Sequence, residues 1–401
     1  MTSLYVHIPF CARRCVYCDF FFTTTDKNYG AFVQALVVEI EAVGKKHGRK
    51  HNGGRLPLRT IYLGGGTPSL LPLDEVKAVL NAVHTHFDTS RVEEVTFEAN
   101  PEDLAPDGDP AAGLDYLRGL RAMGVTRLSL GVQSFYDEDL TFMNRIHNAE
   151  QAERAVAHAL ETFESLSVDL IFGIPEQPFE LWGANLEKAA RLGVPHLSTY
   201  SLTVEARTPL HKQVERGLVE PIADEAMRNR FLFTIDYLTS KGYDHYEVCT
   251  FARPHAGEAT HRSLHNQAYW RHQNYLGVGP SAHSLWWRTG SLADRWANVR
   301  SMRHYQQLLD LHELPTDEID TLDLDALGDE YVLLSLRLMD EGLDLAHARH
   351  RYGLDLATSR RAALAELQRG GLIHPVDDGR IRLTKDGAVV ADAVALKLIG
   401  G

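Results

Sequence analysis

Short apolar runs alternate with amphipathic stretches along the first half of this 401-residue chain. In the amphipathic stretches the apolar residues recur at helical spacing, and several end at a glycine such as Gly124 or Gly193, as helices commonly do. They predict helices near 30–47, 73–87, 111–123, 149–163 and 179–192. The apolar runs have the length of strands, and they predict strands at 4–10, 59–66, 92–100, 126–134, 166–175 and 196–205.

Strand and helix alternate about six times, which is typical of parallel βα units. This alternation leaves an open parallel sheet and a βα barrel as alternatives. No Gly-x-Gly-x-x-Gly motif follows the first predicted strand, so the sequence does not support a dinucleotide-binding start.

Polar residues and glycines gather at or just after the ends of the predicted strands. In a βα barrel this end of each strand carries the chemistry, so six elements would direct side chains to one rim. Glycine, asparagine and aspartate also follow strands because they suit turns, but an inward Gln or Glu is harder to explain that way. The residues in question are Cys11, Gly64–Thr67, Glu98, Asn100, Gln133, Asp169 and Thr203.

The pattern changes after residue 205. A helical stretch at 223–241 precedes a loop-rich span, and a further helix begins near 301–313. The last part reads helix, helix, helix, a hairpin turning at Asp378-Gly379, and a final helix, which is the order of a winged helix. Between 316 and 401 it carries 16 acidic against 10 basic residues, so we expect docking or covering of the barrel rather than DNA binding.

Composition and charge narrow the class of protein. A formal net charge of −13 argues against a general nucleic-acid or anionic-membrane binder, although it leaves a local basic pocket open. No apolar stretch approaches the roughly 18–20 residues of a membrane span, and the first residues lack the pattern of an export signal. We therefore expect a cytoplasmic protein without stable membrane insertion, with peripheral membrane contact left open.

Three of the four cysteines lie in "CARRCVYC", at positions 11, 15 and 18. A disulfide would pair two of them and leave one. Structural zinc prefers four ligands, and the nearest fourth candidates are His7 and Asp19. An iron–sulfur cubane held by three thiolates would leave one of its four irons open to a small molecule, and we favour this interpretation.

The spacing Cys-x3-Cys-x2-Cys after the first strand resembles the signature of the radical S-adenosylmethionine (SAM) superfamily. Tyr17 holds the aromatic position before the last cysteine, and "GGGTPS" at 64–69 follows the second strand. The resemblance implies a partial (β/α)6 TIM-like barrel, a [4Fe-4S] cluster on Cys11, Cys15 and Cys18, and SAM on the open iron. Reductive cleavage of SAM would then yield a 5′-deoxyadenosyl radical.

Further motifs, among them "YVHIPFC", "GVQSF", "SVDLIFGIP" and "HNQAYW", resemble the coproporphyrinogen III oxidase-like branch of that superfamily. The resemblance covers most of residues 5 to 284, and it extends to the winged-helix-like α+β part. It implies a barrel core at 1–205, a flanking extension at 206–313 and a C-terminal domain at 314–401. The SAM-binding residues that it implies are Tyr5, Tyr17, Gly65, Gly66, Thr67, Glu98, Gln133, Arg145, Asp169 and Thr203; for Arg145, an ordinary helix-surface charge is the alternative.

Two members of this branch do different work. The oxygen-independent oxidase decarboxylates propionates of coproporphyrinogen, whereas the HemW type is regarded as a haem chaperone. The oxidase has a further cysteine two residues after the last ligand, where this chain has Phe20, and an N-terminal extension before the motif. Both departures favour the chaperone, which would have haem, an unknown haem-acceptor protein and an electron donor such as a flavodoxin or ferredoxin as partners. Enzymatic activity is uncertain, because the oxidase or another radical SAM enzyme would keep the same cluster and SAM residues.

"HNQAYW" resembles the HNxxYW element that is linked to haem binding in the chaperones. It implies haem contacts from His265, Tyr269 and Trp270; imidazole is a good axial ligand, and the two aromatic rings offer flat apolar surface. The alternative is a hydrogen-bonded core histidine with ordinary aromatic packing. We expect Cys249, in "YEVCTF", to lie in a strand as a small buried hydrophobe.

Overall fold

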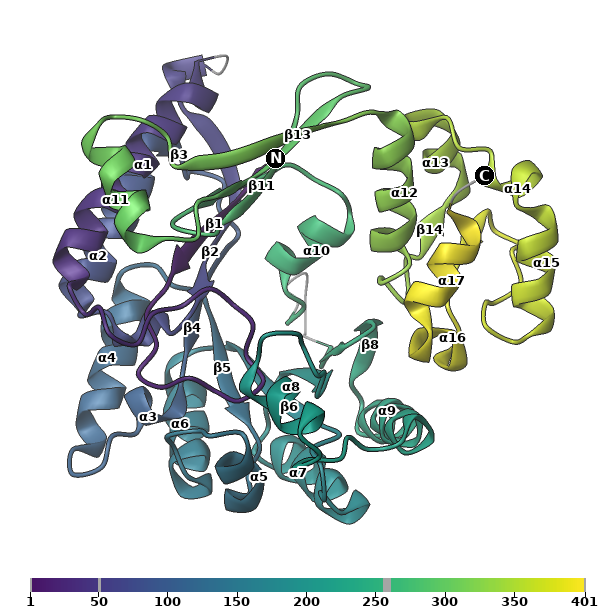
Figure 1. Cartoon of the computed structure of the whole chain (residues 1–401), viewed down its shortest axis with the longest axis horizontal. Coiled ribbons are helices and arrows are strands. Elements are labelled where there is room, and N and C mark those ends of the chain that lie inside the picture. Colours follow the sequence, from purple (N-terminus) through teal and green to yellow (C-terminus); the bar gives the residue numbers. More distant parts are fainter. Residues whose placement is uncertain (1, 50–51, 255–260, 400–401) are drawn as a thin grey trace.

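The computed structural model describes residues 2–49, 52–254 and 261–399 (Figure 1). Six parallel strands pair in chain order, β1-β2-β4-β5-β6-β7, with the linear path of an open barrel. All six predicted strands are confirmed, as are the five predicted helices between them. The strands are β1 (Thr2–Ile8), β2 (Leu56–Gly65), β4 (Glu94–Ala99), β5 (Arg127–Gln133), β6 (Ser165–Phe172) and β7 (His196–Ser201), and the helices are α1 (Tyr29–Gly48), α2 (Leu73–His86), α4 (Pro110–Ala122), α6 (Ala149–Thr162) and α7 (Phe179–Arg191).

Strict alternation along the strands separates the two faces of this sheet. In β5 the apolar side chains Leu128, Leu130 and Val132 are fully buried in the main core, which the helices complete. The intervening positions, including Arg127 and Ser129, face a cavity on the inner side. A closed βα barrel normally packs branched apolar side chains there, so the inner face of this open barrel is built as a polar chamber.

Helix α10 (Leu264–Trp270) closes the amino-terminal end of the chamber. The backbone N–H groups of Leu264 and His265 donate to the two carboxylate oxygens of Glu94, at 3.0 and 2.9 Å. Thr60 on β2 bonds to the ring of His265, and Arg127 on β5 donates to the carbonyl of His261. Three strands thus hold α10, which lies between the sheet and the C-terminal helices in Figure 1.

The sheet continues beyond the six strands at both edges. β10 (Tyr275–Val278) pairs in parallel with β1, and the antiparallel strands β11 (His283–Trp287), β12 (Ala293–Asn298) and β13 (Thr316–Leu322) follow. At the other edge β9 and β8 add a hairpin to β7. The remaining elements of this part are β3 (Phe87–Asp88), α3 (Pro101–Leu104), α5 (Asp137–Phe142), α8 (Pro209–Glu215), α9 (Asp224–Ser240), β8 (Asp244–Glu247), β9 (Thr250–Ala252) and α11 (Met302–Asp310).

The C-terminal helices form a lobe at the right of Figure 1. Its core also includes Val248, Leu285 and Ala293 from the extended sheet and the turn before β9. The predicted order of helices is present, but the predicted hairpin is reduced to one bridge between Ile373 and Leu383. Beyond that bridge, β15 pairs with β14 instead. The division of the chain into domains at residues 205 and 313 stays a prediction. The lobe contains α12 (Leu324–Ser335), β14 (Leu343–Asp344), α13 (Leu345–Tyr352), α14 (Leu356–Ser359), α15 (Arg361–Arg369), β15 (Arg380–Ile381), α16 (Lys385–Val389) and α17 (Ala391–Leu398).

A buried carboxyl group joins α1 to the far edge of the sheet. Glu39 is 1% exposed, and its oxygens accept hydrogen bonds from Asn298 Nδ2, the Gly279 N–H and the Tyr305 hydroxyl. Burial raises the pKa of Glu39 from 4.5 to about 7, against the lowering effect of these donors. The folded protein therefore holds a proton that the unfolded chain has already released in the pH range between these values.

We expect stability from Glu39 to be complete below about pH 4.5 and to be lost as pH rises through about 7. The change corresponds to about 3 kcal/mol. In thermal unfolding, Glu39→Gln should therefore gain stability relative to wild type between pH 5 and pH 8, because glutamine does not titrate. The free energy that the variant loses with a hydrogen-bond acceptor does not depend on pH, so it cancels when the two pH values are compared. The exposed Glu220→Gln serves as control, and parallel pH profiles for wild type and Glu39→Gln would contradict the prediction.

Candidate functional site

A cavity of about 670 Å³ runs from the carboxyl ends of the strands down to α10. Its mouth includes Cys11, Cys15 and Cys18, and its floor includes Ser263 and Asn266. Of the predicted SAM-binding residues, all except Tyr5 line it: Tyr17, Gly65, Gly66, Thr67, Glu98, Gln133, Arg145, Asp169 and Thr203.

The three cysteines lie on the loop that leaves β1, and all are free thiols. Backbone bonds from Cys11 to Thr23 and from Val16 to Met143 hold the loop against its surroundings. Burial raises the pKa of Cys11 to about 12 and also raises that of Cys18. Among the described residues, no group of three or more His, Cys, Asp and Glu is arranged to hold one metal ion. A cubane makes a different demand, since each thiolate binds its own iron, and three thiols around one cavity suit it.

Two side chains from other loops reach the thiols. Thr67 Oγ1 donates to Cys11 Sγ at 3.7 Å, and Arg145 Nη1 donates to Cys15 Sγ at 3.3 Å. Such donors stabilise sulfur that carries negative charge, which is what cluster ligation requires. The donor set of the loop therefore fits an iron–sulfur cluster.

The glycine loop after β2 lies directly against the end of β1. Gly65 has a φ of +114°, and a Cβ there would lie 2.5 Å from the His7 ring. Gly66 donates its N–H to the Ile8 carbonyl at 2.8 Å, and Thr67 donates to the Phe10 carbonyl at 2.6 Å. Glycine is needed here because the backbone approaches β1 too closely for a side chain. The loop thus fixes the segment from which Cys11 projects.

Two acidic side chains form the middle of the cavity wall. Glu98 accepts from the Tyr62 hydroxyl at 2.6 Å and from the Gly65 N–H at 2.9 Å. Burial raises the pKa of Glu98 to about 7, and the neighbouring Asp169 adds to this shift. Burial likewise raises the pKa of Asp169 to about 6, although Ser198 and Arg127 oppose it. A cationic ligand between these carboxyl groups would restore their charge.

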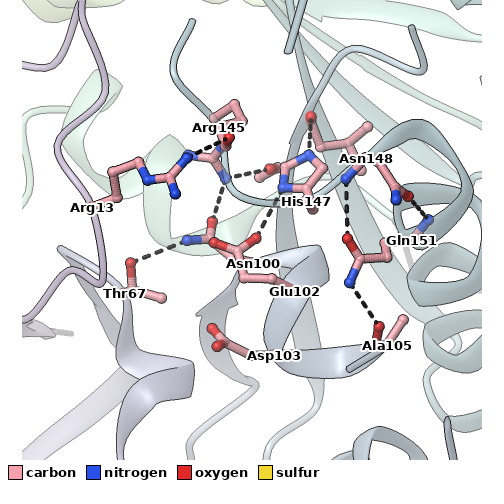
Figure 2. Close-up of polar contacts among 12 residues, drawn as sticks. Arg13, Thr67, Asn100, Glu102, Asp103, Ala105, Arg145, His147, Asn148 and Gln151 are labelled. Atoms are coloured by element: carbon pink, nitrogen blue, oxygen red, sulfur yellow. Dashed lines mark hydrogen bonds and ion pairs between the residues drawn. The ribbon is translucent and has the colours of Figure 1, made fainter. Parts of the chain in front are cut away.

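Arg145 joins the cluster loop to the strands, as Figure 2 shows. Its Nη2 donates to Asn100 Oδ1 at 2.8 Å and to the Gly131 carbonyl at 3.0 Å, and Asn100 in turn donates to Thr67. Its Nε is buried without a partner among the described residues. Arg145 follows α5 in a loop rather than lying on a helix surface. Although burial opposes it, the pKa of Arg145 is raised by Tyr17 and Cys15, so the guanidinium keeps its charge.

The structure places the other predicted residues less uniformly. Gln133 ends β5 with a φ of +68°, a strained conformation for a residue other than glycine, as is common at functional sites. Tyr5 lies behind the cavity wall, where its hydroxyl bonds to the His7 ring at 3.0 Å. Tyr62 and Tyr200 line the cavity and were missed by the sequence analysis. Both occupy inward positions of their strands, a signal that the alternating pattern contained.

The residues predicted to contact haem lie on α10, below the cavity. His265 is fully buried, with Nδ1 bonded to Thr60 Oγ1 at 2.8 Å and Nε2 to the Tyr269 hydroxyl at 2.9 Å. Burial lowers its pKa to about 3, so the ring is neutral. Trp270 stacks under the Arg337 guanidinium, 4.5 Å from the ring centre. Both ring nitrogens of His265 are therefore engaged within the protein.

The expectation that Cys249 lies in a strand was wrong, although its side chain packs, partly buried, against the C-terminal core. It lies in the turn between β8 and β9 rather than in a strand, because the chain reverses there to pair the two strands. Its side chain lines the same cavity as the three clustered cysteines, and Arg337 Nη2 donates to its sulfur at 3.7 Å. Arg337 also pairs with Glu247 at 2.7 Å, which ties the C-terminal lobe to the cavity wall.

An open βα barrel whose mouth gathers three free thiols and a glycine loop defines the class of radical SAM proteins. In agreement, the family model described as the radical SAM superfamily matches residues 5–189, and that of the HemN C-terminal domain matches residues 322–390. Within this class the chain belongs to the HemW family. It is 35% identical over 403 residues to a protein described as haem chaperone HemW from Mycobacterium tuberculosis H37Rv, covering 99% of this chain and 95% of that one.

Other relatives agree with this placement. HemW of Bacillus subtilis 168 is 29% identical over an alignment of 407 positions that covers 100% of this chain and 100% of that one. The solved structure of coproporphyrinogen III oxidase (HemN) from Escherichia coli has a TM-score of 0.79 at 25% identity, covering 99% of this chain and 89% of that one. No helix among the described residues is long and apolar enough to cross a membrane.

Proposed function

We propose that this protein is a haem chaperone, which binds haem and passes it to an acceptor protein. The observation that carries the proposal is the full-length similarity to HemW together with Phe20, which stands where the oxidase pattern has a further cysteine. The Phe20 side chain is 73% exposed at the mouth of the cavity. An apolar surface at that position suits a hydrophobic cargo rather than an additional thiol.

The residues around the mouth support binding of a [4Fe-4S] cluster and SAM. Cys11, Cys15 and Cys18 would hold the cluster, which supplies one electron for reductive cleavage of SAM. The backbone of Gly65 and Gly66 would pass along the ligand, and Glu98 would accept from its ammonium or ribose hydroxyls. The remaining proposed contacts are Tyr5, Tyr17, Thr67, Gln133, Arg145, Asp169 and Thr203.

The rim of the cavity has the chemistry of a haem-docking surface. Here the rim means Arg13, Phe20 and Ile146, which line the cavity, together with Arg14 and Arg207, which are bonded to each other. Phe20 and Ile146 are exposed apolar side chains, and the three arginines are exposed beside them. Arg13 and Arg14 donate only to backbone carbonyls, and none of the three arginines pairs with a carboxylate of the described residues. A porphyrin with two propionates offers apolar faces and two anions, which match this surface.

The predicted haem contacts on α10 remain a second proposal. In this structure His265 could ligate iron only after the Tyr269 hydroxyl released Nε2, and α10 would have to part from the sheet. The neutral imidazole is otherwise suitable as a ligand. Docking at the rim requires no such rearrangement, so we favour the rim as the first contact.

Haem titration of anaerobically reconstituted protein separates these proposals. We expect the double substitution Arg13→Gln and Arg14→Gln to weaken haem binding at least tenfold, because the loss of even one charge-assisted hydrogen bond costs about 1.5–3 kcal/mol and about 1.4 kcal/mol is a factor of ten. His265→Ala should retain the initial binding. Arg303→Gln and Arg361→Gln, on other surfaces, serve as matched controls.

The opposite result is normal haem binding by the arginine variant and loss of binding by His265→Ala. It would refute haem docking at the rim and favour haem binding at α10. Turnover of coproporphyrinogen III by wild-type protein, with SAM and a reductant present, would instead favour the oxidase. Absence of both haem binding and turnover would favour a radical SAM enzyme with another substrate.

The proposed activity also requires partners that bind elsewhere. We propose a haem-acceptor protein of unknown identity and an electron donor such as a flavodoxin or ferredoxin, working in the cytoplasm. Exposed arginines around the cluster loop, in a chain of net charge −13, offer a local cationic surface for an acidic donor.

A further inference from the structure

Below the thiols and the glycine loop, the cavity continues as a lower chamber to which no role has yet been assigned. Its walls are inward positions of β4, β5, β6 and β7, and its floor is α10. Here the lower chamber means the space lined by Thr96, Arg127, Ser129, Ser167, Ser198 and Asn266.

Arg127 is the cationic group of the lower chamber. It is 2% exposed, and its Nη1 donates to Ser165 Oγ at 2.8 Å and to the His261 carbonyl at 2.7 Å. Its other terminal nitrogen, Nη2, is buried and has no partner among the described residues. The Thr96 hydroxyl, fully buried on the neighbouring strand, also lacks one. Two unpaired polar groups beside one cavity indicate a missing polar partner within it, because burying them unpaired is costly.

The acidic groups nearby do not neutralise Arg127 through an ion pair. Both carboxylate oxygens of Glu94 already accept hydrogen bonds from the first N–H groups of α10. Asp169 lies higher in the wall, where the Ser129 hydroxyl donates to it at 3.4 Å. No carboxylate of the described residues lies within ion-pair distance of Arg127. A guanidinium with a free donor edge is the group that proteins use to bind carboxylates.

The adjoining strands β6 and β7 present oriented hydroxyl groups. Ser167 Oγ bonds to His196 Nδ1 at 2.7 Å and to Ser198 Oγ at 3.2 Å. His196 is anchored in turn, because its Nε2 bonds to the Tyr246 hydroxyl at 2.8 Å. Burial and the nearby Arg127 lower the pKa of His196, so it stays neutral and adds no second cation. Ser198 is also hydrogen-bonded to Asp169. The hydroxyl protons are therefore engaged within the protein, and the two serine oxygens are positioned to accept a hydrogen bond from a ligand hydroxyl.

The size of the cavity limits what the lower chamber can hold. The whole cavity, about 670 Å³, is in the range of pockets that enclose one drug-sized molecule. If SAM occupies the upper part, only a small molecule fits beneath it. Such a molecule would lie between the proposed radical source and α10.

We propose that the lower chamber binds a small hydroxy acid, with its carboxylate on Arg127 and Thr96 and its hydroxyl on Ser167 and Ser198. This site is independent of haem docking at the rim, and it gives "HNQAYW" a different purpose. Asn266 of that segment lines the floor, whereas the adjacent His265 anchors α10 through Thr60. His265 is then a positioning residue for the chamber.

The test uses the reconstituted full chain with L-lactate as the probe, followed by ligand-observed NMR in the presence of SAM. Wild type should bind lactate but not lactamide, which has the same shape without the charge. Arg127→Met should bind lactate at least tenfold more weakly, since a charged hydrogen bond is lost. Arg253→Met removes a partly buried arginine outside the cavity, and this control should bind like wild type.

If Arg127→Met does not fold, Ser198→Ala and Asn266→Ala test the proposal instead, and each should weaken lactate binding. Equal binding of lactate and lactamide, no binding by wild type, or unchanged binding in the chamber variants would overturn the proposal. Haem titration of the same variants should match wild type. Loss of haem binding without loss of lactate binding would therefore count against the chaperone proposal alone.

Discussion

Alanine at Cys11, Cys15 or Cys18, introduced one at a time, is expected to leave the protein without an iron–sulfur chromophore after anaerobic reconstitution. Three thiolates are the minimum set around this cavity, and each would hold a different iron. Removing one leaves two irons without a protein ligand, which a cluster in an open cavity does not survive. Bound iron and sulfide, with the visible charge-transfer absorbance, measure the loss.

Cys249→Ala is the matched control, because Cys249 lines the same cavity but projects from the opposite wall. Its sulfur accepts a hydrogen bond from Arg337, and it is not part of the cluster loop, so we expect normal iron content in this variant. If Cys249→Ala lost the cluster while Cys11→Ala kept it, the ligand set would have to be reassigned. Equal loss in all four variants would indicate a general folding defect instead.

The elements of the barrel were predictable because their signals are local. The spacing of apolar residues within a short segment is enough to predict each strand and helix. The cysteine motif in addition marks the loop that follows β1. Even the polar interior was present in the pattern, since Arg127 and Ser129 alternate with Leu128 and Leu130 in one strand. The strand itself was predicted, but the cavity that its polar face lines was not.

Contacts between distant segments could not be predicted in this way. Glu94 meets His265 across 171 positions, and Arg145 meets Cys15 across 130. Neither pair has a local signal, because an acidic residue in a strand and an arginine in a loop are individually unremarkable. Only the fold reveals that "HNQAYW" forms the floor of the barrel. The motif suggested a haem contact, whereas its histidine is held on both ring nitrogens by Thr60 and Tyr269.

The glycine loop yields a second large effect. A Cβ on Gly66 would lie 2.5 Å from the Phe10 carbonyl oxygen and 3.0 Å from that of Ile8. Both are backbone atoms, which cannot swing aside as a flexible side chain can. Gly66→Ala should therefore push the end of β1 outward, together with Cys11 one residue after Phe10. We expect a loss of stability of about 1–3 kcal/mol, as for other overpacked sites.

The same displacement should reach the proposed SAM site, because Gly66 and Thr67 fix β1 through their N–H groups. If about 1.4 kcal/mol of this strain opposes SAM binding, the affinity for SAM falls about tenfold. Equilibrium dialysis with labelled SAM and thermal unfolding measure the two effects. Gly183→Ala provides the control. Gly183 lies within α7, and a Cβ there would meet only the Phe233 ring, at 3.5 Å. Alanine there should be neutral or stabilising by about 0.5–1 kcal/mol. Wild-type SAM affinity and cluster content in Gly66→Ala would show that the loop does not hold the ligand through this contact.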